Sequence, residues 1–91
     1  MRTIWKYDLK PINGPQVVKI PYNAGPVNCR HVEFQGEDLR IWVEVDTEEE
    51  PKPYTFLVYG TGWDIPDDSN IAWFGTATLG DLVWHVFVES P

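Results

Sequence analysis

The sequence is short of helix signals, of cysteine and of long hydrophobic runs. No window of about eleven residues keeps apolar side chains at the i, i+3, i+4, i+7 spacing of an amphipathic helix, and eight prolines and seven glycines interrupt the chain. The single cysteine, Cys29, excludes an intramolecular disulfide. No apolar run is long enough for a signal peptide or a membrane span. These absences predict a cytoplasmic protein built from strands, with no membrane segment.

Large apolar side chains are present in quantity. The 91 residues are 43% hydrophobic and include Trp 5, Tyr 4 and Phe 4, enough for one core without a metal or disulfide. A chain of this length has no room for a second core. We therefore expect a single domain over residues 1–91.

Strand patterns fill most of the chain. Asp38 to Asp46 alternates, with apolar side chains on one face and charged ones on the other, except that Trp42 falls on the charged face. Further strands are predicted over Thr3 to Leu9, Gln16 to Ile20, Asn28 to Gln35, Tyr54 to Gly60, Ile71 to Thr78 and Leu82 to Glu89. Short connections favour pairing in chain order. The prediction is an all-β, antiparallel meander of six or seven strands, either barrel-like or a sandwich.

The last predicted strand is apolar on both faces. One face carries Trp84, Val86 and Val88, and the other carries His85 and Phe87. Such a strand is either covered on both sides in the middle of a sheet or presents its outer face to a partner.

Charge is unevenly distributed along the chain. Residues 1–40 hold six of the seven bases and four acids, whereas residues 41–91 hold one base and ten acids. Unless folding interleaves the two halves, one side of the surface is expected to be acidic, which repels nucleic acid and favours a basic partner. The acidic run from Asp46 to Pro53 is predicted to be a solvated loop, because its spacing does not suit calcium.

Catalytic and metal-binding motifs are not recognisable. Cys29 and His31 lie two apart on a predicted strand and so share a face, but no local motif surrounds them, and His85 is typical of a hydrogen-bonded structural histidine. The Cys and His spacings do not match zinc sites. We expect no enzyme activity and no cofactor, although two of the fourteen acids could face each other after folding.

The stretch Gly60-Thr61-Gly62-Trp63 resembles a binding loop at first sight. A phosphate cradle needs a helix after the glycines, and Pro66 follows instead. The favoured interpretation is a turn in which glycine permits positive φ and Trp63, with Ile65, caps the end of a barrel. The alternative is a nucleobase stacked on Tyr59, Trp63 or Trp73.

Three segments together resemble a known group of proteins. These are the N-terminal M-R-T-I-W-K-Y-D-L, the central Y-T-F-L-V-Y-G-T-G and the C-terminal L-V-W-H-V-F. Their order and spacing are similar to those of an uncharacterised family of small phage and prophage proteins, for which no activity is established. The resemblance implies a viral origin and carries over no catalytic residue. Members often have histidine at the position of Trp63, which implies that the indole is not required there.

The leading hypothesis is a non-enzymatic, phage-derived binding protein in the host cytoplasm that antagonises a host function such as antiviral defence. Its contact surface would use the outer face of the last strand and three tryptophans, because aromatic residues dominate interface hot spots: Trp5, Trp42 and Trp73. The protein is expected to form a homo-oligomer and to bind neither a membrane nor nucleic acid directly.

Two alternatives belong to other classes. A small nucleotide immune signal could be held between protomers near Gly60 to Trp63, with Arg2, Lys6 or Arg40 meeting its phosphate. The acidic half could instead mimic nucleic acid through Glu48, Glu49 and Glu50. A hydrolase or lyase would require carboxylates or histidines that converge in a cleft.

Overall fold

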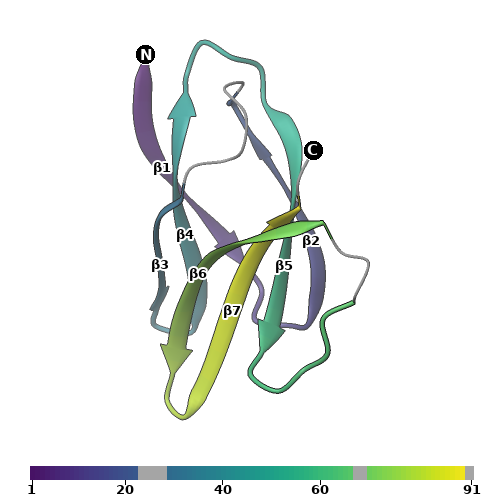
Figure 1. Ribbon diagram of the computed structural model, residues 1–91. Coiled ribbons are helices and arrows are strands. Elements are labelled where there is room, and N and C mark those ends of the chain that lie inside the picture. The colour runs from purple at the N-terminus through teal and green to yellow at the C-terminus, as the bar shows by residue number, and fades with distance from the viewer. Residues whose placement is uncertain (23–28, 67–69, 90–91) are drawn as a thin grey trace.

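The computed structural model describes residues 1–22, 29–66 and 70–89, and these residues form seven β-strands and no helix (Figure 1). The strands are β1 Arg2–Leu9, β2 Gly14–Ile20, β3 Cys29–Gln35, β4 Asp38–Asp46, β5 Lys52–Gly60, β6 Ile71–Leu79 and β7 Leu82–Glu89. The predicted bounds of β4 and β7 are confirmed, and the other five strands differ by at most two residues at an end, with Asn28 outside the described residues. In this part of the chain no helix has the length and apolarity needed to cross a membrane.

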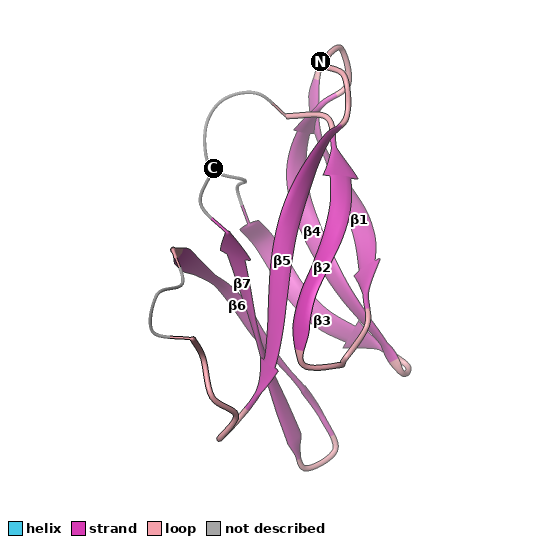
Figure 2. Cartoon of the chain, turned by 90° about the vertical axis from the view of Figure 1, so that its right-hand side faces the viewer, coloured by secondary structure: helices cyan, strands magenta, loops and turns pink. Residues whose placement is uncertain are grey.

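The strands form two antiparallel sheets that pack as a sandwich (Figure 2). The three-stranded sheet has the order β1-β4-β3, and the four-stranded sheet has the order β2-β5-β7-β6. The all-β class is confirmed, and of the two predicted shapes the sandwich is the observed one. Pairing in chain order is wrong for most of the molecule, since only β3 with β4 and β6 with β7 are chain neighbours among the described pairs. The faces that the two sheets turn toward each other are apolar, and the connections from β1 to β2, β2 to β3 and β4 to β5 cross between the sheets, so that these faces are buried against each other.

The core lies between the sheets. The four apolar residues of β4 have no exposed surface, which confirms the alternation predicted for this strand: Leu39, Ile41, Val43 and Val45. The facing sheet contributes Phe56 and Val86, and the ring of Phe56 packs edge to face on Phe74, with ring centroids 5.1 Å apart. Burying each such side chain stabilises the fold by about 1.5–3 kcal/mol.

The two sheets meet closely along β3 and β6. Gly75 of β6 lies against Val32 of β3, so closely that a Cβ at position 75 would come within 2.3 Å of Val32 Cγ2. The register of β6 shifts between Trp73 and Gly75, which marks a bulge next to this contact. One side of the sandwich is therefore closed by two edge strands that cover each other.

Candidate binding surfaces on the two outer faces

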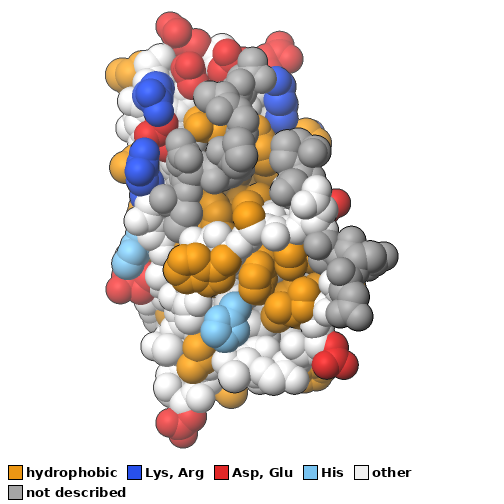
Figure 3. Space-filling model, in the orientation of Figure 1, with side chains coloured by type: hydrophobic (Ala, Val, Ile, Leu, Met, Phe, Trp, Pro, Cys, Tyr) orange, Lys and Arg blue, Asp and Glu red, His pale blue; other side chains and the backbone are white. Residues whose placement is uncertain are grey.

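The outer face of the four-stranded sheet is apolar. We call it the apolar face and define it by six residues: Val17, Leu57, Tyr59, Trp73, His85 and Phe87. Their alignment follows from the register, in which Phe87 lies between Leu57 and Trp73 in one row. Trp73 is 65% exposed and Val17 64%. Figure 3 shows hydrophobic side chains gathered over β6 and β7 beside a histidine.

A chain of hydrogen bonds runs across the apolar face. Trp73 Nε1–H donates to Thr76 Oγ1 at 3.1 Å, and Thr76 Oγ1 lies 3.2 Å from His85 Nδ1. On its other side, His85 Nε2 lies 2.8 Å from Thr61 Oγ1. A hydroxyl both donates and accepts, so the imidazole is satisfied in either tautomer. The chain fixes the orientation of the Trp73 indole while leaving its ring exposed.

The loop that follows β5 is a turn that supports this face. Gly62 has φ +89°, which confirms the predicted positive φ, and Trp63 N–H donates to the Gly60 carbonyl at 3.1 Å. The Gly60 N–H donates to Asn13 Oδ1 at 3.0 Å, which joins the loop to the start of β2. Thr61 contributes the hydroxyl that meets His85.

The two aromatic residues of this loop have different surroundings. Tyr59 is 7% exposed, and its ring packs on Phe87 with centroids 6.2 Å apart. Trp63 is 63% exposed and lies over Gly60, where a Cβ would meet Trp63 Cδ1 at 2.9 Å. The expectation that Trp63 caps a barrel is corrected: the sheets do not close into one, and most of the indole is in solvent.

The outer face of the three-stranded sheet is polar and ion-paired. Glu44 of β4 contacts both Arg2 and Arg30, the latter at 2.6 Å. Arg40 Nε donates to Asp8 Oδ1 at 2.9 Å. Bases from the first half of the chain therefore neutralise acids on this face, and folding interleaves the two halves here.

Trp42 lies on this same polar face, as its position in β4 predicted. Its ring is half-buried, with the centroid 5.3 Å from that of His31. Lys6 is its cross-strand neighbour in β1. The aromatic neighbour of Trp42 is therefore His31 of the adjacent strand β3.

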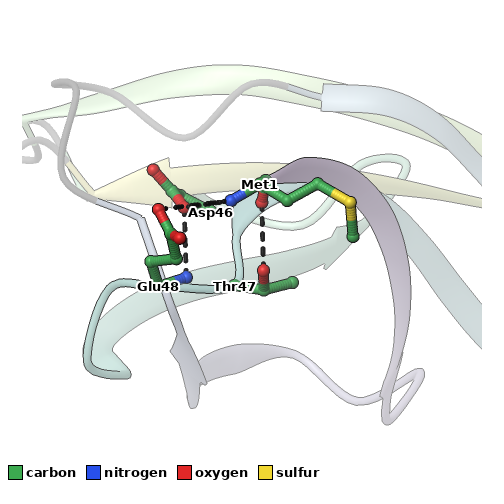
Figure 4. A network of polar contacts seen from close by, with 4 residues as sticks. All are labelled: Met1, Asp46, Thr47 and Glu48. Carbon is green, nitrogen blue, oxygen red and sulfur yellow. Dashed lines mark hydrogen bonds and ion pairs between the residues drawn. The ribbon is translucent and has the colours of Figure 1, made fainter.

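Acidic side chains surround the Met1 amine at the end of the molecule where β4 ends (Figure 4). The Met1 amine lies 3.3 Å from Asp46 Oδ1 and 3.5 Å from Glu48 Oε2. Desolvation lowers the pKa of the amine, but the hydrogen bond and charge of Asp46 outweigh it and raise the pKa above 8.0. The Glu48 backbone N–H, followed by the Met1 amine, lowers the pKa of Asp46 below 3.8.

The residues predicted as one binding site fall on different surfaces. Tyr59, Thr61 and Trp73 come together around His85, whereas the three expected phosphate-binding bases lie with Trp42 on the opposite outer face: Arg2, Lys6 and Arg40. Trp5 lies on the core side of β1 opposite Val43, and it is 44% exposed. Within one protomer, the bases and the Gly60-to-Trp63 loop do not meet.

Sequence reasoning missed Val17 and Leu57 as members of the apolar face. They are recognisable only once β2 is paired with β5, because Val17 then lies opposite Thr55, in the row beside Leu57. The alternation of Leu57 and Tyr59 along β5 was the available signal.

The shared face that alternation gives Cys29 and His31 is not supported by the strand pairing. The ladder shifts its register between these two residues, which interrupts the alternation on which the pairing rested. The Cys29 side chain lies outside the described residues. Among the residues that the structure does describe, no three His, Cys, Asp or Glu side chains cluster closely enough to hold a metal ion.

The molecule is thus a small antiparallel β-sandwich with one apolar and one ion-paired outer face. It belongs to the family described as a domain of unknown function, DUF7352, whose model matches residues 1–91. No curated protein and no solved structure matches the chain.

Proposed function

We propose that this protein is a non-enzymatic binding protein of phage origin that antagonises a host function, such as antiviral defence, by occupying a host protein in the host cytoplasm. The resemblance of the three sequence segments to small phage proteins supports the origin. Membership of an uncharacterised family is compatible with it. The contact surface is the apolar face.

The proposal rests on the exposure and the fixed orientation of the Trp73 side chain. This large side chain is 65% exposed, yet its indole N–H is already bonded to Thr76. Binding hot spots are enriched in tryptophan, and a side chain held in place before binding loses little conformational entropy in the complex. The half-buried Phe87 beside it extends the apolar contact area. An exposed, oriented aromatic on an apolar face fits a protein partner.

Replacing Trp73 by alanine tests this use of the face. We expect Trp73→Ala to weaken binding of the captured host protein by at least about tenfold, which corresponds to about 1.4 kcal/mol. The measurement is pull-down from infected cells with the tagged protein, followed by titration of the protein recovered. Trp63→Ala is the matched control, because Trp63 is 63% exposed but lies outside the apolar face. Equal loss in both variants, or none in Trp73→Ala, would contradict the proposal.

A small nucleotide is the second candidate ligand, and the polar chain beside Trp73 favours it. The indole offers a stacking surface, and the hydroxyl groups of Thr61 and Thr76 lie next to it, held by His85. Phosphate would then need bases from a second protomer, since Arg2 and Arg40 of the same chain lie on the other sheet. Calorimetry with cyclic nucleotides and nucleotide-ribose signals should show saturable heat that Trp73→Ala removes. No heat with a folded sample rejects this candidate.

A further inference from the structure

β1 is an edge strand of the three-stranded sheet. Among the described residues β1 pairs with β4 alone, over all eight of its residues and without a register shift (Figure 2). Proteins protect such edges with proline, bulges or covering segments, because an open edge is a template for another strand. β2, another edge strand, contains Pro15, and β3 and β6 cover each other. β1 has neither proline nor a bulge.

We propose that β1 pairs antiparallel with β1 of a second copy of this chain, about a two-fold axis that passes beside Trp5. An axis perpendicular to the sheet reverses the strand direction and keeps both core faces on the same side. The two three-stranded sheets become one continuous sheet. Trp5 of one copy then lies opposite Trp5 of the other.

The charges of β1 select this register. With Trp5 on the axis, Arg2 of each copy lies opposite Asp8 of the other, so two pairs of opposite charge form. A register with Lys6 on the axis places two lysines opposite each other. A register with Ile4 on the axis places Arg2 opposite Lys6 twice. Like charges directly opposite destabilise a strand pair, and opposite charges stabilise it. A register with Tyr7 on the axis also places opposite charges together, with Lys6 opposite Asp8, but it aligns only residues 5–9 of the strand, whereas the first register aligns residues 2–8. Of the registers with complementary charges, the first therefore pairs the longer segment.

Packing supports the same register. Trp5 is 44% exposed although it lies on the core side of its sheet, opposite Val43 of β4, and pairing places the two indoles side by side at the margin of both cores. Ile4 is 50% exposed on the outer side, and Lys6 of the other copy lies opposite it, where its methylene groups cover it. This surface is separate from the apolar face, so its test is independent of the proposed function.

Sedimentation equilibrium tests the dimer through paired charge reversals. The 10.5 kDa chain should have twice that mass at about 100 µM. Arg2→Asp alone and Asp8→Arg alone create like-charge pairs in their homodimers, so each variant should be monomeric. A mixture of the two should dimerise, because a mixed dimer places an acid opposite a base at both positions. Circular dichroism confirms that each variant is folded, and Trp63→Ala should remain dimeric.

Cysteine cross-linking tests the register. Side chains directly opposite in an antiparallel pair have Cβ atoms about 4.5–5.5 Å apart, close to disulfide geometry. Two variants are made in a Cys29→Ser background, Trp5→Cys and Lys6→Cys. Oxidation should join two copies of Trp5→Cys by a disulfide and leave Lys6→Cys as single chains. A monomeric wild-type protein, a mixture of the charge variants that stays monomeric, or a link through Lys6→Cys would overturn the proposal.

Discussion

Gly75 shows how a single residue sets the distance between the two sheets. It has no side chain at the point where β6 meets β3, and a Cβ there would lie 2.3 Å from Cγ2 and 2.9 Å from Cβ of Val32. A groove of about 580 Å³ lies along this junction, and His31 and Trp73 are among the residues that line it. The position of Trp73 on the apolar face therefore depends on a glycine two residues away.

Gly75→Ala should lower the free energy of unfolding by about 1–3 kcal/mol, because overpacking forces the two strands apart. Urea unfolding monitored by tryptophan fluorescence measures the change. Adding Val32→Ala removes Cγ2, the atom that would lie 2.3 Å from the new Cβ, so the double variant should lose less stability than the two single changes together. Additive losses would show that the Val32 contact is not the cause.

At the level of the strands, local pattern and long-range pairing differ in how far they are predictable. The bounds of β4 and β7 follow from alternation and turn residues, which are local properties of the chain. The pairing of β1 with β4 and of β2 with β5 is not local, since it joins residues such as Arg2 and Asp46. Propensity and spacing carry no signal for such contacts, so pairing in chain order was the wrong default.

The candidate binding surface likewise contains residues that the sequence predicts and contacts that only the fold reveals. Trp73 and the outer face of β7 were predictable, because a tryptophan and a strand apolar on both faces are visible in the sequence. The bond between Thr61 and His85 spans 24 positions and depends on the turn after β5 lying beside β7. Threonine is too common for such a partner to be recognised without the fold. Sequence reasoning thus finds the exposed aromatic but not the polar groups that orient it.

For the whole molecule, the placement of charge decides how stability depends on pH. Acids of the second half pair with bases and with the amine of Met1, so folding places opposite charges together rather than creating an acidic face on the three-stranded sheet. The pKa of Asp46 is lowered, mainly by the Glu48 backbone N–H. At the alkaline end of the pH scale, the pKa of Tyr54 is raised, mainly by desolvation and to a lesser extent by Tyr22. The Tyr54 hydroxyl donates to the Tyr22 carbonyl at 2.8 Å.

These two pKa shifts affect stability at opposite ends of the pH scale. The folded state holds Asp46 charged at a pH where the unfolded chain protonates it, so this contribution is complete above pH 3.8 and is lost as pH falls through the folded pKa. The folded state holds Tyr54 neutral, so its contribution is complete below pH 10.0 and is lost as pH rises through the folded pKa.

Urea midpoints measured from about pH 3 to about pH 11 should therefore decline at both ends. Asp46→Asn should flatten the acid decline. It should also lessen the alkaline decline, because Asp46 raises the pKa of the Met1 amine above 8.0. Tyr54→Phe should reduce the alkaline decline and leave the acid one unchanged, with the remainder arising from the Met1 amine and from Tyr7, whose pKa desolvation also raises. Tyr54→Phe is therefore the control for the acid decline. If the acid decline persists in Asp46→Asn, it arises from other carboxylates, and the stabilising role of the Asp46 contacts is contradicted.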